Sequence, residues 1–331
     1  MTEYPIAQVP RTEHEVVIEY PNTFSPENVY IHRLYVAEYG NPNGIPLIFL
    51  HGGPGAGHDP KWQRFFNPDK YRIIFSDQRS CGKSTPYAEW QKNTLADLVD
   101  DIEKIRTQLG IKQWGVVGGR SFGSTLALEY AKANPQKLKH LLLASVFFGD
   151  KDGANHIGEA KGAVPYEQKY FDAYQDLVPK DQRDKIIDYY YLIMTSGTPE
   201  MKLEAAKRFM MWDISIAGAN IEEVQSSIDA VERNPADEIA ITTLFMHYAV
   251  QEFRNRTPDD ILKSEALKDI PMTIVHGCLD RITPFVNALR LKSAFPNAVP
   301  YSCTHAGHSG NHPQMIHATR MAADEIARSL G

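Results

Sequence analysis

Short apolar runs bounded by turn residues recur along the first 150 residues of the chain. Four of them are nearly continuous in apolar residues, which is the pattern of strands buried on both faces of a parallel sheet. They lie at 46–50, 71–75, 114–117 and 138–148. Two earlier stretches, 15–20 and 30–39, are bounded by Pro, Asn or Gly and also predict strands.

Helical periodicity lies between these runs. In the segment 93–110, apolar residues recur at spacings of three and four and Gly110 follows the last of them, which predicts a helix and its end. A second helix is predicted from Ser121 to the Asn134-Pro135 pair. Strands that alternate with helices indicate parallel βαβ units, so we expect an α/β fold.

The alternation stops near residue 150 and resumes after residue 262. The intervening segment is helical in pattern, contains no apolar strand run, and is acidic and rich in aromatic residues. Beyond it come a strand at 272–276, a helix from about 284, a strand at 298–303 and a helix from about 312. We therefore predict an α/β domain made of residues 1–149 and 263–331, interrupted by a helical cap at 150–262. The acidic cap is either a solvated surface or a lid that concentrates a cationic substrate.

Composition narrows the class of protein. The 331 residues are 43% hydrophobic and 23% charged, as in ordinary globular proteins, and the formal net charge is −6. An acidic chain does not suit nucleic-acid binding, and no apolar run reaches the roughly 20 residues that a membrane span needs. Three cysteines are too few for a disulfide framework and the first residues lack a signal-peptide pattern, so we expect a cytoplasmic protein. Nothing in the composition specifies an oligomer.

The first candidate for chemistry is the G-x-S-x-G motif Gly119-Arg-Ser-Phe-Gly123. It stands between a predicted strand and a predicted helix, the context that a nucleophile turn requires. The turn would lift Ser121 above the sheet and place the N–H of Phe122 at a helix N-terminus, where it can stabilise an oxyanion. We predict that Ser121 is a nucleophile; the alternative is a glycine-rich corner with an inert serine.

A serine nucleophile needs a base, and the base needs an acid that orients it. Asp280 follows the strand predicted at 272–276, and His308 follows the next strand along the chain. The resulting order is Ser–Asp–His, each residue placed after a strand. We therefore predict a triad of Ser121, Asp280 and His308.

Two further histidines, His305 and His312, are rivals for the base. Gly307 permits a tight turn directly before His308, which favours His308. The three histidines could also be read as metal ligands, but no carboxylate or cysteine pair stands beside them. We expect no metal.

A glycine-rich turn, His51-Gly-Gly-Pro-Gly-Ala-Gly57, follows the strand that ends at Leu50. Such a turn lets backbone N–H groups approach a substrate carbonyl. We assign the second oxyanion donor to the N–H of Gly53, beside that of Phe122.

Three motifs in the same order resemble those of one family. HGGPG at 51–55, DQRSCGKS at 77–84 and GRSFGSTLAL at 119–128 are similar to the HGGPG, DQRGxGxS and GGSWGSTLAL segments of the proline iminopeptidases. The resemblance covers roughly 30–148 and 265–330. It implies an α/β-hydrolase fold with a mostly parallel central sheet, flanking helices and an inserted helical cap. It also implies the triad and oxyanion donors named above, and release of N-terminal proline from peptides without a cofactor.

The chain departs from the family pattern beside the nucleophile. Arg120 stands where the family has Gly, and Phe122 replaces its Trp. A long cationic side chain at position 120 needs space or a carboxylate partner. We expect a surface or salt-bridged arginine there.

The cap departs as well. Family members bind the substrate ammonium with two cap glutamates, one of them in a Trp-Glu-Gly motif, where this chain has Trp212-Asp213. The second glutamate stands two positions before a His-Tyr pair, where this chain has Phe245. The resemblance thus implies Trp212, Asp213 and Phe245 as substrate-binding positions, with Glu252 or another cap acid as the replacement carboxylate.

The sequence leaves three functions open, and in each we expect the bound molecule to be a small peptide, amide or ester. The first is a serine aminopeptidase that releases N-terminal proline or another small residue through an acyl-enzyme. Phe245 motivates the second, an esterase or amidase for neutral acyl groups. The third is a non-catalytic binding protein on a hydrolase scaffold.

Overall fold

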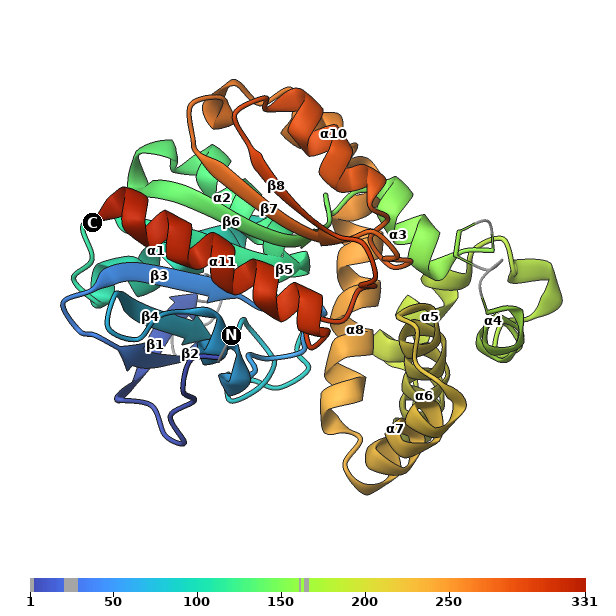
Figure 1. The fold of residues 1–331 in the computed structure, drawn as a ribbon. Helices are drawn as coiled ribbons and strands as arrows, with labels where there is room; N and C mark the ends of the chain where they lie inside the picture. Colours follow the sequence, from blue (N-terminus) through green and yellow to red (C-terminus); the bar gives the residue numbers. More distant parts are fainter. Residues whose placement is uncertain (1–2, 21–28, 161, 164–166) are drawn as a thin grey trace.

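The computed structural model describes residues 3–20, 29–160, 162–163 and 167–331. Within them, eight strands form one sheet in the order β1-β2-β4-β3-β5-β6-β7-β8 (Figure 1). The strands are β1 (Thr12–Tyr20), β2 (Tyr30–Gly40), β3 (Ile45–Leu50), β4 (Tyr71–Ser76), β5 (Trp114–Ser121), β6 (Leu138–Val146), β7 (Met272–Gly277) and β8 (Val299–Cys303). β2 pairs antiparallel with β1 and β4, and all pairs from β4 to β8 are parallel. The predicted strands and the mostly parallel sheet are therefore confirmed.

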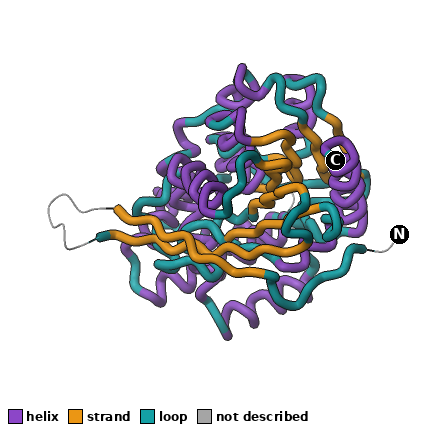
Figure 2. Tube along the Cα trace, turned by 90° about the vertical axis from the view of Figure 1, so that its left-hand side faces the viewer, coloured by secondary structure: helices purple, strands orange, loops and turns teal. Residues whose placement is uncertain are grey.

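Helices cover both faces of this sheet, as the views of Figures 1 and 2 show. α1 (Leu95–Gln108), α2 (Phe122–Ala133) and α10 (Val286–Ala294) pack on one face, while α11 (Pro313–Leu330) and the short 3-10 helix η1 (Pro60–Phe65) pack on the other. Along β3, Ile48 and Leu50 belong to the first apolar cluster, and Leu47 and Phe49 belong to the second. Because alternate side chains point to opposite faces and both faces are covered, the strand is apolar throughout.

Between β6 and β7 the described residues form helices and no strand. These helices are α3 (Lys151–Gly158), α4 (Gln168–Gln175), α5 (Ile186–Ser196), α6 (Pro199–Ile216), α7 (Ile221–Arg233), α8 (Ala236–Gln251) and α9 (Asp259–Leu262). Most of them gather on one side of the sheet, with α8 nearest to it (Figure 1). Their apolar side chains join the α1–α2 cluster, and the division into two domains at residues 150 and 262 stays a prediction.

No helix within the described ranges is long and apolar enough to cross a membrane.

Candidate active site

Ser121 occupies the sharp turn between β5 and α2. Its backbone has φ 55° and ψ −126°, a sparsely populated conformation that costs on the order of 1–3 kcal/mol. An ideal Cβ on Gly119 would lie 2.1 Å from the carbonyl oxygen of Gly123, and one on Gly123 would lie 2.1 Å from that of Leu50. Both glycines of the motif are therefore required for the turn to close against the end of β3.

The glycine-rich loop after β3 packs directly on this serine. An ideal Cβ on Gly52 would lie 2.9 Å from the Cβ of Ser121, and Gly53 has φ 110°. Phe122 is the first residue of α2, so its N–H is one of the donors that the helix leaves unpaired. The backbone N–H groups predicted for an oxyanion hole thus belong to two segments that meet at Ser121.

A neutral histidine, His51, stabilises the glycine-rich loop after β3. His51 is buried, its Nδ1 lies 2.8 Å from the carbonyl oxygen of Gly52, and its Nε2 accepts the N–H of Gln78 at 3.0 Å. Burial lowers the pKa of His51 to about 4, which agrees with a neutral ring that donates on one side and accepts on the other. The DQRSCGKS segment, to which Gln78 belongs, therefore supports the HGGPG loop.

Asp280 and His308 are joined by a hydrogen bond of 2.8 Å between Oδ2 and Nδ1. The other oxygen of Asp280, Oδ1, accepts the N–H groups of Ile282 and Thr283 at 3.0 and 2.8 Å, and Thr283 Oγ1 donates to Oδ2 at 2.9 Å. Burial favours the neutral acid, yet the charges and hydrogen bonds of His308 and His276 hold the pKa of Asp280 well below its usual range. An ionised Asp280 fixes the proton on Nδ1 and leaves Nε2 of His308 as the basic atom.

The nucleophile turn meets the loop that carries His308, because Arg120, next to Ser121, packs against Gly310, two residues after His308. Among the described residues, no hydrogen bond joins Ser121 Oγ to His308 Nε2, a contact that in free enzymes often tightens only when substrate binds. The rivals lie elsewhere: His305 is exposed, and His312 caps the start of α11. Within the described ranges no group of three or more His, Cys, Asp or Glu side chains is placed to hold a metal ion.

Two carboxylates of the cap lie near one another, and one of them lies near His308. Asp213 lies one turn before the C-terminal end of α6, where the carbonyl oxygen of Ala217 would be 3.6 Å from an ideal Cβ on Gly307. Burial raises the pKa of Asp213 to about 6, and the nearby His308 opposes that rise. Burial also raises the pKa of Glu238, in the first turn of α8, to about 8, with Asp213 as the largest charge acting on it. Asp213 therefore lies within electrostatic range of both His308 and Glu238.

Glu238 is the residue that sequence reasoning missed. It lies seven positions, or two helical turns, before Phe245 on the same face of α8. This end of α8 sits on the oxyanion loop, because an ideal Cβ on Gly55 would be 3.0 Å from Leu244 Cδ1 and 3.2 Å from the carbonyl oxygen of Ala240. A helical projection of 236–251 would have put Glu238 in line with the missing acid.

Two predicted substrate-binding positions, Trp212 and Phe245, are buried inside the cap. Trp212 is fully buried and donates its indole N–H to the carbonyl oxygen of Ile157 at 2.6 Å. Phe245 is 3% exposed and stacks on Phe209 with ring centroids 5.0 Å apart, inside the cap. Both side chains are buried within the cap, and their part in substrate binding stays a prediction.

Glu252 is also far from the pair. It follows the last turn of α8, fourteen residues after Glu238, which corresponds to about 21 Å along a helix. Burial raises its pKa, and the nearby Arg256 opposes that rise. Glu252 therefore lies too far along the chain from Glu238 to share a site with the carboxylate pair.

Arg120 is neither a surface residue nor a salt-bridged one. Its Nε and Nη2 atoms are buried and have no hydrogen-bond partner among the described residues. Burial lowers the pKa of this guanidinium to about 10, with Asp280 as the opposing charge. The expectation of a surface or salt-bridged arginine is therefore wrong. The loop that follows His308 covers the guanidinium, and no carboxylate bonds to its Nε or Nη2.

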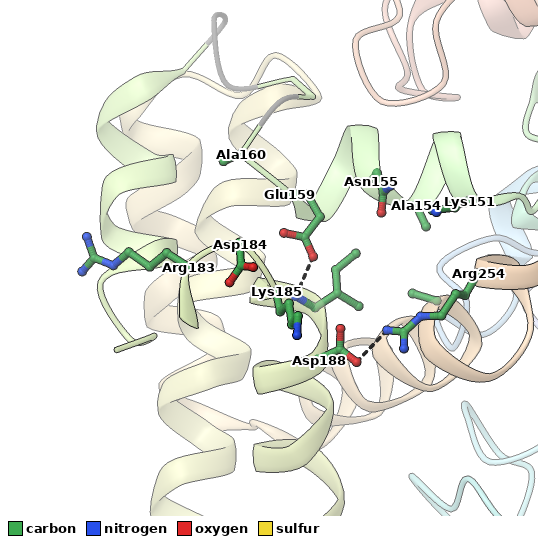
Figure 3. Close-up of a pocket in the computed structure, with 12 residues that line it drawn as sticks. Lys151, Ala154, Asn155, Glu159, Ala160, Arg183, Asp184, Lys185, Asp188 and Arg254 are labelled. Carbon is green, nitrogen blue, oxygen red and sulfur yellow. Dashed lines mark hydrogen bonds and ion pairs between the residues drawn. The ribbon is translucent and has the colours of Figure 1, made fainter. Parts of the chain in front are cut away.

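A pocket of about 490 Å³ opens elsewhere on the cap, between α3, α5 and the end of α8 (Figure 3). Its charges are largely satisfied locally: Arg254 bonds Asp188 at 2.6 Å, and Glu159 accepts the N–H groups of Ile186 and Ile187. None of the triad, oxyanion or paired-carboxylate residues lines it. We do not regard it as the active site.

Comparison with known proteins agrees with this geometry. Residues 45–314 match a family described as alpha/beta hydrolase fold. The chain is 37% identical over 301 residues to a proline iminopeptidase of Neisseria meningitidis serogroup B, covering 91% of this chain and 94% of that one. It is 36% identical over 304 residues to a proline iminopeptidase of Arabidopsis thaliana, covering 91% and 78%. Among solved structures, esterase E22 is similar at a TM-score of 0.62 and 15% identity, covering 97% and 100%, a likeness of fold alone.

Proposed function

The chain belongs to the proline iminopeptidase family of α/β hydrolases, and from that premise we propose that it is a serine aminopeptidase that releases N-terminal proline, or another small residue, from peptides and aminoacyl amides. One observation carries the requirement for a free N-terminus: Asp213, which lies within electrostatic range of His308, is also within range of a second cap carboxyl, Glu238, and both pKa values are raised. Two carboxyls in one buried site share protons because their negative charges repel. A secondary ammonium placed between them supplies the missing positive charge.

The chemistry follows from the hydrogen bonds around His308. Nε2 of His308 takes the proton of Ser121 Oγ as that oxygen attacks the scissile carbonyl. The negative oxygen that forms is stabilised by the N–H groups of Gly53 and Phe122. His308 then gives the proton to the leaving amine, and water hydrolyses the resulting prolyl ester of Ser121 by the same steps.

The hydrogen bond from His308 Nδ1 to Asp280 supports this assignment of roles. The ionised Asp280 keeps the imidazole in one tautomer and stabilises the imidazolium that forms during each proton transfer. The esterase alternative was motivated by the apolar residue at position 245; that ring stacks on Phe209 inside the cap, which supports a structural role for it.

The test is a substrate panel on the purified protein. It compares prolyl 2-naphthylamide, alanyl 2-naphthylamide, N-acetylprolyl 2-naphthylamide and naphthyl acetate, with Ser121→Ala as the control. We expect turnover of the free prolyl amide and at least about a hundredfold loss on acetylation, because the acetylated nitrogen carries no charge for Asp213 and Glu238 to bind. Preference for the acetylated amide or the ester would contradict the proposal.

A second measurement separates an enzyme from a binding protein. A fluorophosphonate probe should label Ser121 in the wild-type protein and not in Ser121→Ala. Absence of labelling in folded wild-type protein would favour a non-catalytic scaffold. The proposal also includes a cytoplasmic location, which the three free cysteines support.

A further inference from the structure

The guanidinium of Arg120 is the one buried cation beside the nucleophile that the proposed reaction leaves unused. Its Nε and Nη2 atoms have no partner among the described residues, although they lack accessible surface. Burying a polar group without a partner is unfavourable, and more so when the group is charged. Asp280 is near enough to act on this cation by charge, yet no described residue accepts a hydrogen bond from Nε or Nη2, so these donors call for an acceptor that the free chain does not supply.

Other arginines of the chain show which anion fits. Arg72, Arg79 and Arg106 each direct Nε and Nη2 to the two oxygens of a single carboxylate, on Glu38, Asp101 and Glu103 respectively. These six contacts span 2.6 to 3.1 Å. The same two atoms form the vacant edge of Arg120, so the missing partner has the shape of a carboxylate.

The guanidinium of Arg120 packs against the loop that carries His308, the proposed base. The guanidinium lies against Gly310, where an ideal Cβ would be 2.8 Å from Nε and 3.1 Å from Cζ. Gly310 follows His308 by two residues, and His308 is the group that protonates the leaving amine. The first residue of the leaving peptide must lie next to His308, and the loop that carries His308 also contacts Arg120.

We propose that Arg120 binds the C-terminal carboxylate of the leaving residue, so that the preferred substrates are dipeptides with proline first. This inference rests on the proposed aminopeptidase function. In a dipeptide the carboxylate belongs to the leaving residue itself, one Cα step of about 3.8 Å beyond the proline. Asp213 and Glu238 then hold the positive end of the substrate and Arg120 the negative end. Because both nitrogens are covered in the free chain, the segment around Gly310 has to yield as the carboxylate enters.

The experiment compares prolyl-alanine with prolyl-alaninamide, which differ only in the charge of the C-terminus. The readout is the ratio of their kcat/KM values in the wild type, Arg120→Gln, Gly310→Ala and the control Arg233→Gln on the exposed end of α7. We expect the wild type to favour the carboxylate by about 10- to 100-fold. Arg120→Gln should bring the ratio close to one, and Arg233→Gln should leave it at the wild-type value.

Gly310→Ala keeps the charge of Arg120 but displaces it, because the added Cβ would lie 2.8 Å from Nε. It should lower the same ratio, and as a ratio it is insensitive to a general loss of activity. This second variant, checked for folding by circular dichroism, supports the proposal even where Arg120→Gln folds poorly.

Three outcomes would overturn the carboxylate site. A wild-type ratio near one does so without any variant. A ratio that survives in Arg120→Gln assigns the preference to another group. Chloride that activates cleavage of prolyl 2-naphthylamide in the wild type but not in Arg120→Gln assigns the site to an inorganic anion. Cleavage of neither prolyl substrate, by contrast, overturns the aminopeptidase function and the site with it.

Discussion

Replacing Glu238 by Gln tests the ammonium site most directly. Gln keeps the size of the side chain and removes its negative charge. Truncating one partner of a buried charge pair costs about 2–5 kcal/mol, which corresponds to about a 30- to 5,000-fold loss of kcat/KM for a substrate with a free prolyl nitrogen. Glu252→Gln, at the opposite end of α8, is the matched control and should leave that constant within about twofold of the wild type.

The loss should depend on pH in a defined direction. Burial and Asp213 raise the pKa of Glu238 to about 8, so at pH 7 about nine-tenths of this carboxyl is protonated in the free enzyme. Recruiting the charged form then costs about 1.4 kcal/mol, roughly a factor of ten. At pH 9 Glu238 is already ionised. The advantage of the wild type over Glu238→Gln should therefore grow about tenfold from pH 7 to pH 9.

The assay is kcat/KM for prolyl 2-naphthylamide between pH 6 and 9.5 in both proteins. Taking their ratio cancels the titration of the substrate nitrogen and of His308, which both proteins share. Naphthyl acetate reports on the triad alone and should be hydrolysed equally by both. A ratio near one at every pH, or an equal loss on the ester, would refute the assignment of Glu238 to the ammonium.

The remaining predictions concern the triad, the nucleophile turn and stability. Asp280→Asn should lower kcat by about 10³- to 10⁴-fold without unfolding the protein, since Asn no longer fixes the proton on Nδ1 of His308; a loss below tenfold in steady-state kinetics would count against the triad. Gly123→Ala places a Cβ 2.1 Å from the carbonyl oxygen of Leu50, so it should yield insoluble protein or a Tm lower by more than about 5 °C in thermal unfolding. The pKa of Glu238 is higher in the folded chain, about 8, than in the unfolded chain. Folding therefore becomes less favourable as the pH rises between these two pKa values, because the unfolded chain releases the proton of Glu238 first. Glu238→Gln should therefore raise the Tm at pH 9 and change it little at pH 4, and an unchanged Tm at pH 9 would contradict burial of the charge.

The sequence alone determined the elements and their order, because the signals for them are local. Continuous apolar runs predict strands covered on both faces, and the helical periodicity of 93–110 marks α1 within a few residues of its bounds, Leu95–Gln108. The glycines around Ser121 are recognised locally, as a motif of five residues, although Gly123 is required by a contact with the distant carbonyl oxygen of Leu50. The same holds for placing Asp280 and His308 after consecutive strands, because the carboxyl ends of parallel strands share one edge of a sheet.

Only the tertiary structure decided which cap acid meets Asp213. The motif spacing indicated position 245, and Glu252 was the acid named as a replacement. In the structure, however, it is the N-terminal end of α8 that lies near Asp213, and this end carries Glu238. The unpaired state of Arg120 was equally invisible, because it depends on the 308–311 loop covering a side chain from β5. Burial and the crossing of helices arise from contacts between residues far apart in sequence, and no local pattern records them. The sequence thus determined the sheet, the nucleophile turn and the members of the predicted triad, whereas the packing of the cap determined which charges surround them.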